Sequence, residues 1–148
     1  MKIIDCFDGE FWFLSNFAES PFIGGDGITY PTNEHFFQAM KTNSMEERRA
    51  IAAAKTPGEA KRMGRKVELR SDWEEMKLDV MRDGLKRKFD THKDLRELLL
   101  ATGDAELIEG NTWHDRTWGN CSCEKCKNIP GKNYLGKCLM ELRESYRK

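Results

Sequence analysis

The sequence has neither a long hydrophobic run nor an excess of charge of either sign. No apolar stretch approaches the roughly 18 residues that a membrane span needs. The apolar stretch within residues 1–5 is too short for a signal peptide. The 25 Lys and Arg residues balance 25 Asp and Glu residues, so no strongly basic field favours non-specific nucleic-acid binding. We expect a cytoplasmic protein with no membrane partner.

Several well-known catalytic motifs are also absent. The chain has no GxGxxG fingerprint, P-loop or HExxH motif. It has no GxSxG nucleophile elbow and no Ser/His/Asp arrangement typical of a serine hydrolase. Its five cysteines are an odd number, which fits reduced thiols better than a disulfide framework.

The pattern of the chain predicts one compact, mainly helical α+β domain over residues 1–148, with a small β element at its N-terminal end. Short strands are expected at 3–7, 10–14 and 27–30. Helices are expected to begin at four capping residues: Asn33, Ser44, Thr56 and Ser71. The last of these should begin the longest helix. A loop over about 103–132 should then lead into a final helix from about Lys132.

One short helix presents an acid, an amide and an amine. At about 100° per residue, Glu34, Gln38 and Lys41 fall within an arc of roughly 60°. Spacing alone favours a solvated face, because most charged helix positions are exposed to water. The alternative is that the three side chains face a functional site.

Two further clusters lie in the predicted loop. Glu109, Trp113, His114, Asp115 and Trp118 fall within ten residues, an arrangement that fits either a binding loop or tryptophans that fix the loop to the core. A third cluster, Cys121, Cys123 and Cys126, has a spacing that allows three thiolates to reach one structural zinc ion. The fourth ligand would be His114 or Cys138. The alternative is a reduced thiol loop that binds no metal.

Several segments occur in an order that resembles the NADAR, or YbiA-like, family over about residues 11–143. They are FLSNF (13–17), PF (21–22), YPTNEHFFQAMK (30–41), TPGEAKRMGR (56–65), MRDGLKRKF (81–89), LLATGDAELIEG (99–110), DRTWGN (115–120) and GKNYLGKCLMELR (131–143). The resemblance implies an N-glycosidase that cleaves the bond between a ribose and an amino-bearing base. It also implies as substrates either phosphoribosylamino-pyrimidines of riboflavin synthesis or ADP-ribosylated guanine in nucleic acid.

The resemblance assigns the functional residues. It implies functional roles for Glu34, Lys41, Glu109, Asp115, Trp118, Gly119 and Asn133. We expect the first four of these to be catalytic, and the other three to bind substrate together with Asn16 and Gln38. We expect Glu34, Lys41, Glu109, Asp115 and Trp118 to line one pocket. No cofactor is expected for catalysis. The chemistry could run through carboxylates that stabilise a cationic ribose or through a Schiff base on Lys41.

One segment departs from the family pattern. NCSCEKCKNIPGK (120–132) replaces a short glycine-containing turn, next to the expected site. The substrate is therefore left open between a ribose-phosphate compound, an ADP-ribose compound and ADP-ribosylated nucleic acid. Two other functions remain: a non-catalytic binder of NAD- or ADP-ribose-type ligands, and a zinc-stabilised interaction module.

Overall fold

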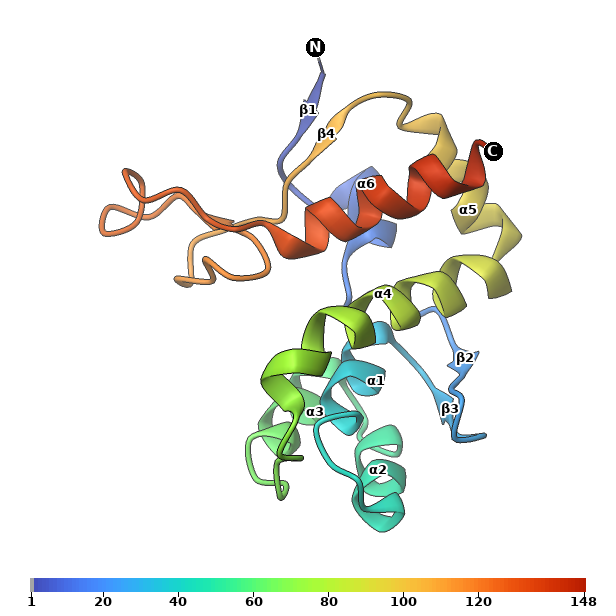
Figure 1. The fold of residues 1–148 in the computed structure, drawn as a ribbon. Helices are drawn as coiled ribbons and strands as arrows, with labels where there is room; N and C mark the ends of the chain where they lie inside the picture. Colours follow the sequence, from blue (N-terminus) through green and yellow to red (C-terminus); the bar gives the residue numbers. More distant parts are fainter. Residues whose placement is uncertain (1) are drawn as a thin grey trace. The chain divides into compact units, whose positions relative to one another are not determined.

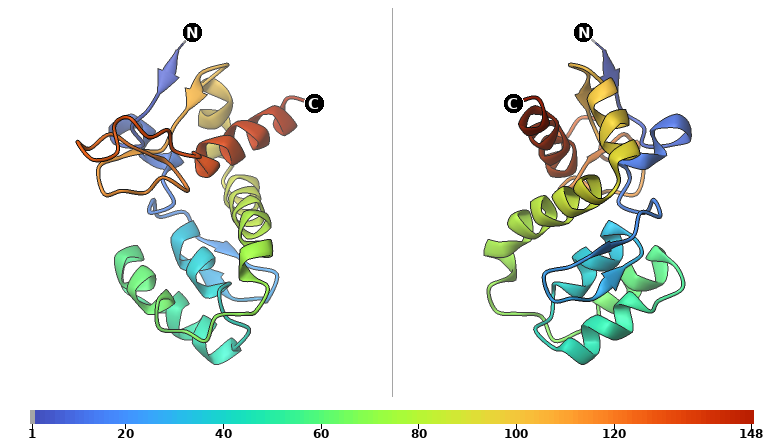
Figure 2. Two further views of the ribbon diagram at one scale, coloured as in Figure 1. Left: turned by 60° about the vertical axis from the view of Figure 1, so that its left-hand side comes forward. Right: turned by 90° about the vertical axis from the view of Figure 1, so that its right-hand side faces the viewer.

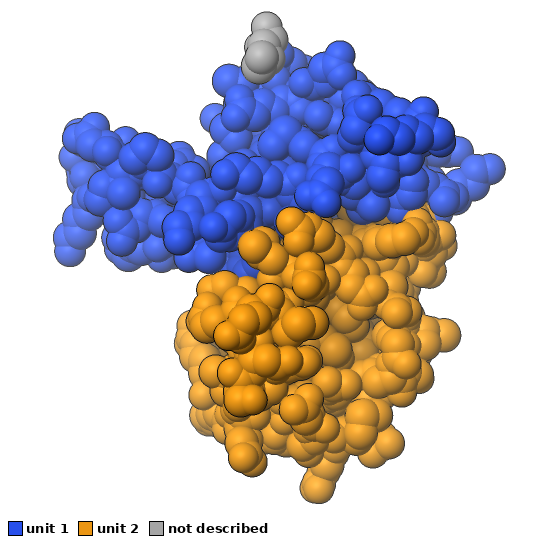
Figure 3. Space-filling model, viewed as in Figure 1, with its two compact units in different colours: residues 1–15, 93–148 blue, residues 16–92 orange. Residues whose placement is uncertain are grey.

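The computed structural model describes residues 2–148, which pack as two units. Unit 1 contains the described residues up to Ser15 together with residues 93–148, and unit 2 contains residues 16–92 (Figure 3). Each unit has its own buried apolar residues.

Unit 2 is built around a short helix that is buried along its whole length. Helix α1 (Asn33–Ala39) contacts three other helices and the strand that precedes it (Figures 1 and 2). The elements of unit 2 are β2 (Phe22–Ile23), β3 (Thr29–Tyr30), α1, α2 (Met45–Ala52), α3 (Pro57–Gly64) and α4 (Trp73–Thr91). Strands β2 and β3 form an antiparallel pair. Phe36 of α1 packs edge-on against Phe22 and Tyr30, which ties the strand pair to the helix.

Two of the four helix caps predicted from the sequence of unit 2 are confirmed. Ser44 and Thr56 cap α2 and α3, and each side chain accepts a hydrogen bond from the backbone three residues later. The predicted cap at Asn33 is wrong: Thr32 caps α1, and Asn33 is its first residue. The predicted start at Ser71 is also wrong, because α4 begins at Trp73 after Asp72. Helix α4 is nevertheless the longest described, with 19 residues.

Unit 1 packs two α-helices, one 3₁₀-helix and four short strands around an apolar centre. Its elements are β1 (Ile3–Ile4), the 3₁₀-helix η1 (Gly9–Leu14), α5 (Lys93–Ala101), β4 (Glu106–Leu107), β5 (Gly110–Asn111), β6 (Asn120–Cys121) and α6 (Tyr134–Tyr146). Strand β1 pairs in parallel with β4, and β5 pairs in parallel with β6. Leu99, Leu107, Leu135 and Leu139 are fully or almost fully buried.

One predicted strand of unit 1 is a helix instead. Residues 10–14 lie within η1, whose start is capped by the Asp8 side chain. Gly9, which has a positive φ of 55°, lets the backbone turn there. The predicted loop at 103–132 is mostly irregular, but it contains β4, β5 and β6.

The fold class predicted from the sequence is confirmed as α+β and mainly helical, with few and short strands. The β element is smaller than expected, because only two residues of each strand pair. Among residues 2–148, no helix is long and apolar enough to cross a bilayer.

Candidate active site

The polar arc on α1 is not a solvated face. Glu34 is 8% exposed and Gln38 is 4% exposed, and all seven residues of α1 are buried. Burying a charged and an amide group is costly unless each is hydrogen-bonded. A solvated face, which the spacing alone favours, is therefore wrong for Glu34 and Gln38, because both side chains lie in the interior of the protein.

Gln38 and Glu34 are joined directly. Gln38 Nε2 donates to Glu34 Oε2 over 2.6 Å, a short bond of the kind that an ionised acceptor favours. The other atom of the amide, Gln38 Oε1, is buried without a protein partner. Gly64 of α3 allows this close packing, because a Cβ at that position would collide with Gln38 Oε1. The arrangement orients the Glu34 carboxylate and leaves one buried acceptor unsatisfied.

Two asparagines lie beside this pair in unit 2. Asn33 Nδ2 donates to Asn16 Oδ1 over 2.9 Å, and both amides contact Met81 Sδ of α4. Asn16 also accepts from the Glu34 backbone through its carbonyl oxygen. Asn16 is thus buried against the start of α1, where it fixes the backbone of Glu34.

Lys41 lies two residues beyond the end of α1, in a half-buried position. Burial lowers the pKa of its amine. The charge of Glu34 opposes that shift, and the charges of Arg65 and Lys61 reinforce it. The net direction is downward, so a larger fraction of the Lys41 amine is neutral than in an exposed lysine.

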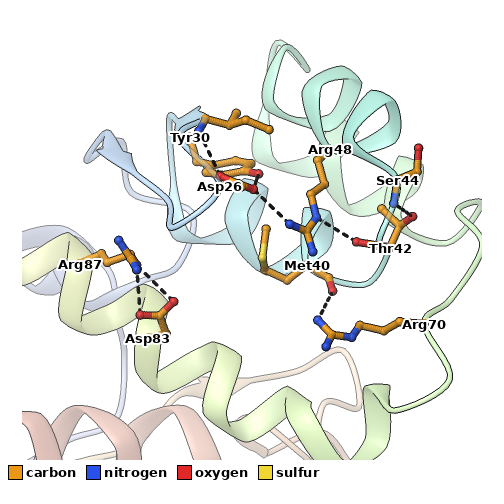
Figure 4. A network of polar contacts seen from close by, with 10 residues as sticks. Asp26, Tyr30, Met40, Thr42, Ser44, Arg48, Arg70, Asp83 and Arg87 are labelled. Atoms are coloured by element: carbon orange, nitrogen blue, oxygen red, sulfur yellow. Dashed lines mark hydrogen bonds and ion pairs between the residues drawn. The ribbon is translucent and has the colours of Figure 1, made fainter.

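The backbone around Lys41 is held by two arginines (Figure 4). Arg48 Nε donates to the Thr42 carbonyl over 2.9 Å, and Arg70 donates to the Met40 carbonyl through its guanidinium. The Arg70 backbone N–H also donates to the Lys41 carbonyl over 2.7 Å. Three successive carbonyls are therefore fixed, which limits the movement of the Lys41 side chain's attachment point.

A basic hollow lies on α3 near Lys41. It has a volume of about 450 Å³ and is lined by Glu59, Arg62, Met63, Arg65 and Lys66. Arg65 belongs to this lining and also acts on the pKa of Lys41. The positive charge of the hollow therefore acts on the amine through Arg65.

Glu109 of unit 1 is held by two asparagines. Asn133 Oδ1 accepts from the Glu109 backbone over 2.9 Å, and Asn133 Nδ2 donates to the Leu107 carbonyl. Asn111 Nδ2 donates to Glu109 Oε2 over 3.0 Å. Asn133 adopts a left-handed backbone at the start of α6, with φ of 52°, which asparagine tolerates better than most residues. It acts as a clamp on the segment that carries Glu109.

Asp115 organises the turn that follows β5. Its Oδ1 accepts from the backbone N–H groups of Thr117 and Trp118, over 3.1 and 2.9 Å. Asn111 exchanges two hydrogen bonds with the Asp115 backbone. The Trp118 ring packs edge-on against Tyr134, with 6.1 Å between the ring centroids. The Asp115 carboxylate thus has a structural role in this turn, separate from any catalytic role.

The packing of Gly119 explains why no side chain can replace its hydrogen. A Cβ at Gly119 would collide with both the carboxylate and the backbone carbonyl of Glu109. The Asn120 backbone N–H donates to that same carbonyl over 2.9 Å. Gly119 therefore acts through the position of Glu109. Substrate binding by Gly119 itself stays a prediction.

The cysteine cluster gathers four candidate ligands in unit 1. His114 joins Cys121, Cys123 and Cys126, and their ligand atoms all lie within 4.8 Å of one another. Cys138, the other candidate for fourth ligand, is buried in α6 and is not part of this group. Burial raises the pKa of Cys126 to about 11, and hydrogen bonds and charge from the neighbouring thiols reinforce the shift.

Comparison with known proteins identifies the fold and the enzyme class. The NADAR domain profile matches residues 7–147. The chain belongs to the NADAR family. It is 48% identical over 133 residues to N-glycosidase YbiA of Escherichia coli (strain K12), covering 88% of this chain and 79% of the relative. It is 42% identical over 123 residues to N-glycosidase Npun_R5314 of Nostoc punctiforme, covering 80% of this chain and 75% of that protein.

A solved structure agrees with the sequence relatives. The NMR structure of E. coli YbiA matches with a TM-score of 0.81 and 43% identity, covering 99% of this chain and 85% of that one. The NADAR resemblance and the enzyme class, an N-glycosyl hydrolase, are confirmed. A maize protein, riboflavin biosynthesis protein PYRR, is 38% identical over 146 residues, covering 88% of this chain and 22% of that protein.

The candidate residues divide between the two units. Unit 2 brings together Asn16, Glu34, Gln38 and Lys41, and unit 1 brings together Glu109, Asp115, Trp118, Gly119 and Asn133. The expectation that residues of both groups line one pocket stays a prediction.

Sequence reasoning missed two residues. Asn111 contacts both Glu109 and Asp115, but an asparagine within a predicted loop carries no distinctive signal. Lys88 of α4 is fully buried, which lowers its pKa to about 7. Lys88 follows Leu85, a buried residue of the same helix, by three positions, and this helical spacing was the signal in the sequence.

Proposed function

We propose that this NADAR protein hydrolyses the C1–N bond between a phosphoribose and an amino-bearing pyrimidine. The observation that carries the proposal is the half-buried Lys41 amine, whose pKa is lowered, within electrostatic reach of the buried Glu34 carboxylate. Burial and two cationic neighbours lower the pKa of the Lys41 amine, and a buried carboxylate oriented by Gln38 acts on it electrostatically. A lysine with a lowered pKa near a fixed carboxylate suits Schiff-base chemistry, because more of its amine is in the nucleophilic neutral form.

The proposed reaction begins with the sugar. The amino-linked ribose opens to an imine at C1, and the Lys41 amine adds to that carbon. Glu34 takes the proton that the Lys41 nitrogen loses after it adds, and passes this proton to the departing amine as the C1–N bond to the base breaks. The resulting lysine imine is attacked by water, with Glu34 accepting a proton. Release of the sugar aldehyde restores the Lys41 amine, so one water is consumed for each bond cleaved.

We assign Glu109 and Asp115 to the same reaction as carboxylates that favour positive charge at C1 of the sugar. Carboxylates stabilise oxocarbenium-like states in glycoside hydrolysis. Asp115 already holds two backbone N–H groups through Oδ1. We therefore assign Oδ2, the other oxygen of the Asp115 carboxylate, to contact with the substrate. Asn16, Trp118 and Asn133 are assigned to substrate binding and to fixing these acids.

The basic hollow supports a phosphate on the substrate. Arg62, Arg65 and Lys66 line it, and arginine suits planar two-point contacts with phosphate oxygens. Relatives from maize and Vibrio vulnificus are named riboflavin biosynthesis proteins, and we take phosphoribosylamino-pyrimidines as the first substrate class. ADP-ribosylated guanine is the second, because exposed Lys125, Lys127 and Lys132 could meet a phosphate backbone.

A hydrolysis screen tests the proposal. The protein is incubated with phosphoribosylamino-pyrimidine, its dephosphorylated riboside and ADP-ribosylated guanine DNA, and products are read by mass spectrometry. We expect release of the pyrimidine from the phosphorylated compound, with a higher KM for the riboside. Arg65→Ala should remove that difference in KM, while Arg49→Ala, an exposed control on α2, should preserve it. Turnover of none of the three compounds would contradict the proposal and favour a non-catalytic ligand binder.

No cofactor enters this scheme, because amine and carboxylates supply every proton and electron pair. We assign any zinc at the cysteine cluster a structural role. We also propose that the protein works in the cytoplasm, where a reducing environment keeps such thiols available as ligands.

A further inference from the structure

Four metal-ligating side chains of unit 1 take no part in the proposed hydrolysis. They are His114, Cys121, Cys123 and Cys126. Cysteine sulfur and histidine nitrogen are preferred zinc ligands, and three cysteines with one histidine form a common structural set. We propose that this His/Cys3 cluster is a zinc site that locks the segment from Asn111 to Cys126 in one conformation.

The distances between the ligand atoms suit a tetrahedral ion. His114 Nδ1 lies 3.3 Å from Cys123 Sγ and 3.4 Å from Cys126 Sγ. Zinc bond lengths of about 2.3 Å to sulfur and 2.0–2.1 Å to nitrogen give tetrahedral N···S edges of about 3.6 Å and S···S edges of about 3.8 Å. All four ligand atoms already lie within 4.8 Å of one another. Shifts of a few tenths of an ångström to about one ångström complete the coordination.

The backbone also prepares the cluster. His114 has a φ of 70°, a conformation that is uncommon for residues other than glycine. Its backbone N–H donates to Cys121 Sγ over 3.3 Å, which holds these two ligand residues close together. A tight turn returns the chain from Cys123 to Cys126, where the Cys126 N–H donates to the Cys123 carbonyl over 3.0 Å.

The ion would be structural. Four protein ligands fill a tetrahedral zinc and leave no position for water or substrate. Cys138 contributes nothing to the site, because it packs in the apolar face of α6. His114 therefore completes the set.

The proposed ion closes a loop around a candidate catalytic residue. Asp115 and Trp118 lie in the sequence between two ligands, His114 and Cys121. The Asp115 carboxylate holds the N–H groups of Thr117 and Trp118, so a fixed loop keeps these bonds formed. The site therefore couples metal binding to the order of the Asp115 turn. Metal binding itself does not depend on the proposed hydrolysis.

The first test is direct metal analysis of the full-length protein. We expect about one zinc per chain by elemental analysis. Cobalt should replace it with the intense visible absorption typical of tetrahedral sulfur coordination. Zinc-free protein whose Cys121, Cys123 and Cys126 all react with a thiol reagent, even after incubation with zinc, would overturn the proposal.

Matched variants locate the ion. Cys123→Ser and His114→Asn should each lower bound zinc at least tenfold, and asparagine tolerates the positive φ at 114. Cys6→Ser removes an exposed cysteine outside the cluster and should keep the zinc. Helical content by circular dichroism shows that each variant is folded. Equal zinc content in Cys123→Ser and Cys6→Ser would place the metal elsewhere and contradict the proposal.

Hydrogen exchange tests the coupling without an activity measurement. On removal of zinc by a chelator, the amides of Thr117 and Trp118 should exchange at least tenfold faster. Amides within α4, which lies in unit 2, should keep their rates. Unchanged exchange at Thr117 and Trp118 after verified zinc loss would show that the ion does not order this turn.

Discussion

Gln38 Nε2 donates to Glu34 Oε2 over 2.6 Å, and both side chains are almost completely buried. An amide one helical turn away thus fixes the orientation of a carboxylate in the interior. The opposite amide atom, Gln38 Oε1, has no protein partner. The burial of this pair excludes a solvated face for Glu34 and Gln38, because such a face would leave both side chains in water.

Removal of the Gln38 amide should lower turnover by releasing the Glu34 carboxylate. A hydrogen bond to a charged group contributes about 1.5–3 kcal/mol, which corresponds to roughly a 10- to 100-fold loss. We expect Gln38→Met, which keeps similar volume, to lower kcat by about that factor. Steady-state kinetics with a thermal melt of the same sample gives the measurement. Wild-type kcat in Gln38→Met would show that the Glu34 orientation does not depend on Gln38.

Lys41→Ala should abolish turnover while the protein stays folded. A partly exposed lysine outside a core network changes the free energy of unfolding by about 0.5 kcal/mol or less. Borohydride added during turnover should trap a sugar adduct on Lys41 in the wild-type protein. The control variant Lys55→Ala, which changes an exposed lysine, should give the same amount of trapped adduct. Strong residual activity in Lys41→Ala with no trapped adduct would leave a mechanism that uses carboxylates alone.

The pH profile of kcat/KM should reflect the lowered pKa of Lys41. Activity should rise with pH as the amine loses its proton, and the midpoint should lie below 10.5, the ordinary value. Lys61 carries one of the positive charges that lower this pKa. Lys61→Ala should therefore shift the acidic limb to higher pH. A limb that does not move in Lys61→Ala at low ionic strength would show that another group controls it.

Gly119→Ala should destabilise unit 1 by forcing Glu109 to move. The added methyl group collides with backbone as well as side-chain atoms of Glu109. We expect a loss of about 1–3 kcal/mol in the free energy of unfolding. Gly58→Ala is the matched control, because its nearest neighbours lie 3.9 Å away and alanine favours a helix. Denaturant melts of both variants make the comparison, and equal stability would contradict the packing argument.

His35 should make unit 2 less stable in acid. Burial lowers the pKa of its ring below 6.5, while hydrogen bonding to the Ala54 carbonyl opposes the shift. The unfolded chain then binds a proton more readily than the folded one, so stability falls as the pH drops below about 6.5. His35→Gln keeps a donor for the Ala54 carbonyl but has no charge to gain. Its urea midpoint should decline less than that of wild type between pH 7 and 5, and parallel declines would rule out His35 as the cause.

The sequence by itself determined the family, the helix-rich α+β class and the caps of α2 and α3. These depend on local rules: Ser44 and Thr56 bond to backbone only three residues away, so short patterns carry enough information. Local rules failed at residues 10–14, whose aromatic composition suggested a strand. A capping aspartate and a positive φ at Gly9 produced a 3₁₀-helix there.

Only the tertiary structure decided the environment of the candidate site. Glu34 and Gln38 are buried because α2, α3 and α4 pack around α1, and helical spacing contains no information about what packs on a polar face. The choice of His114 over Cys138 in the metal cluster depends on the paths of β5, β6 and α6, which bring residues together across long separations. The lowered pKa of Lys41 has the same origin, because burial and the charges of Lys61 and Arg65 reach the amine only through the fold.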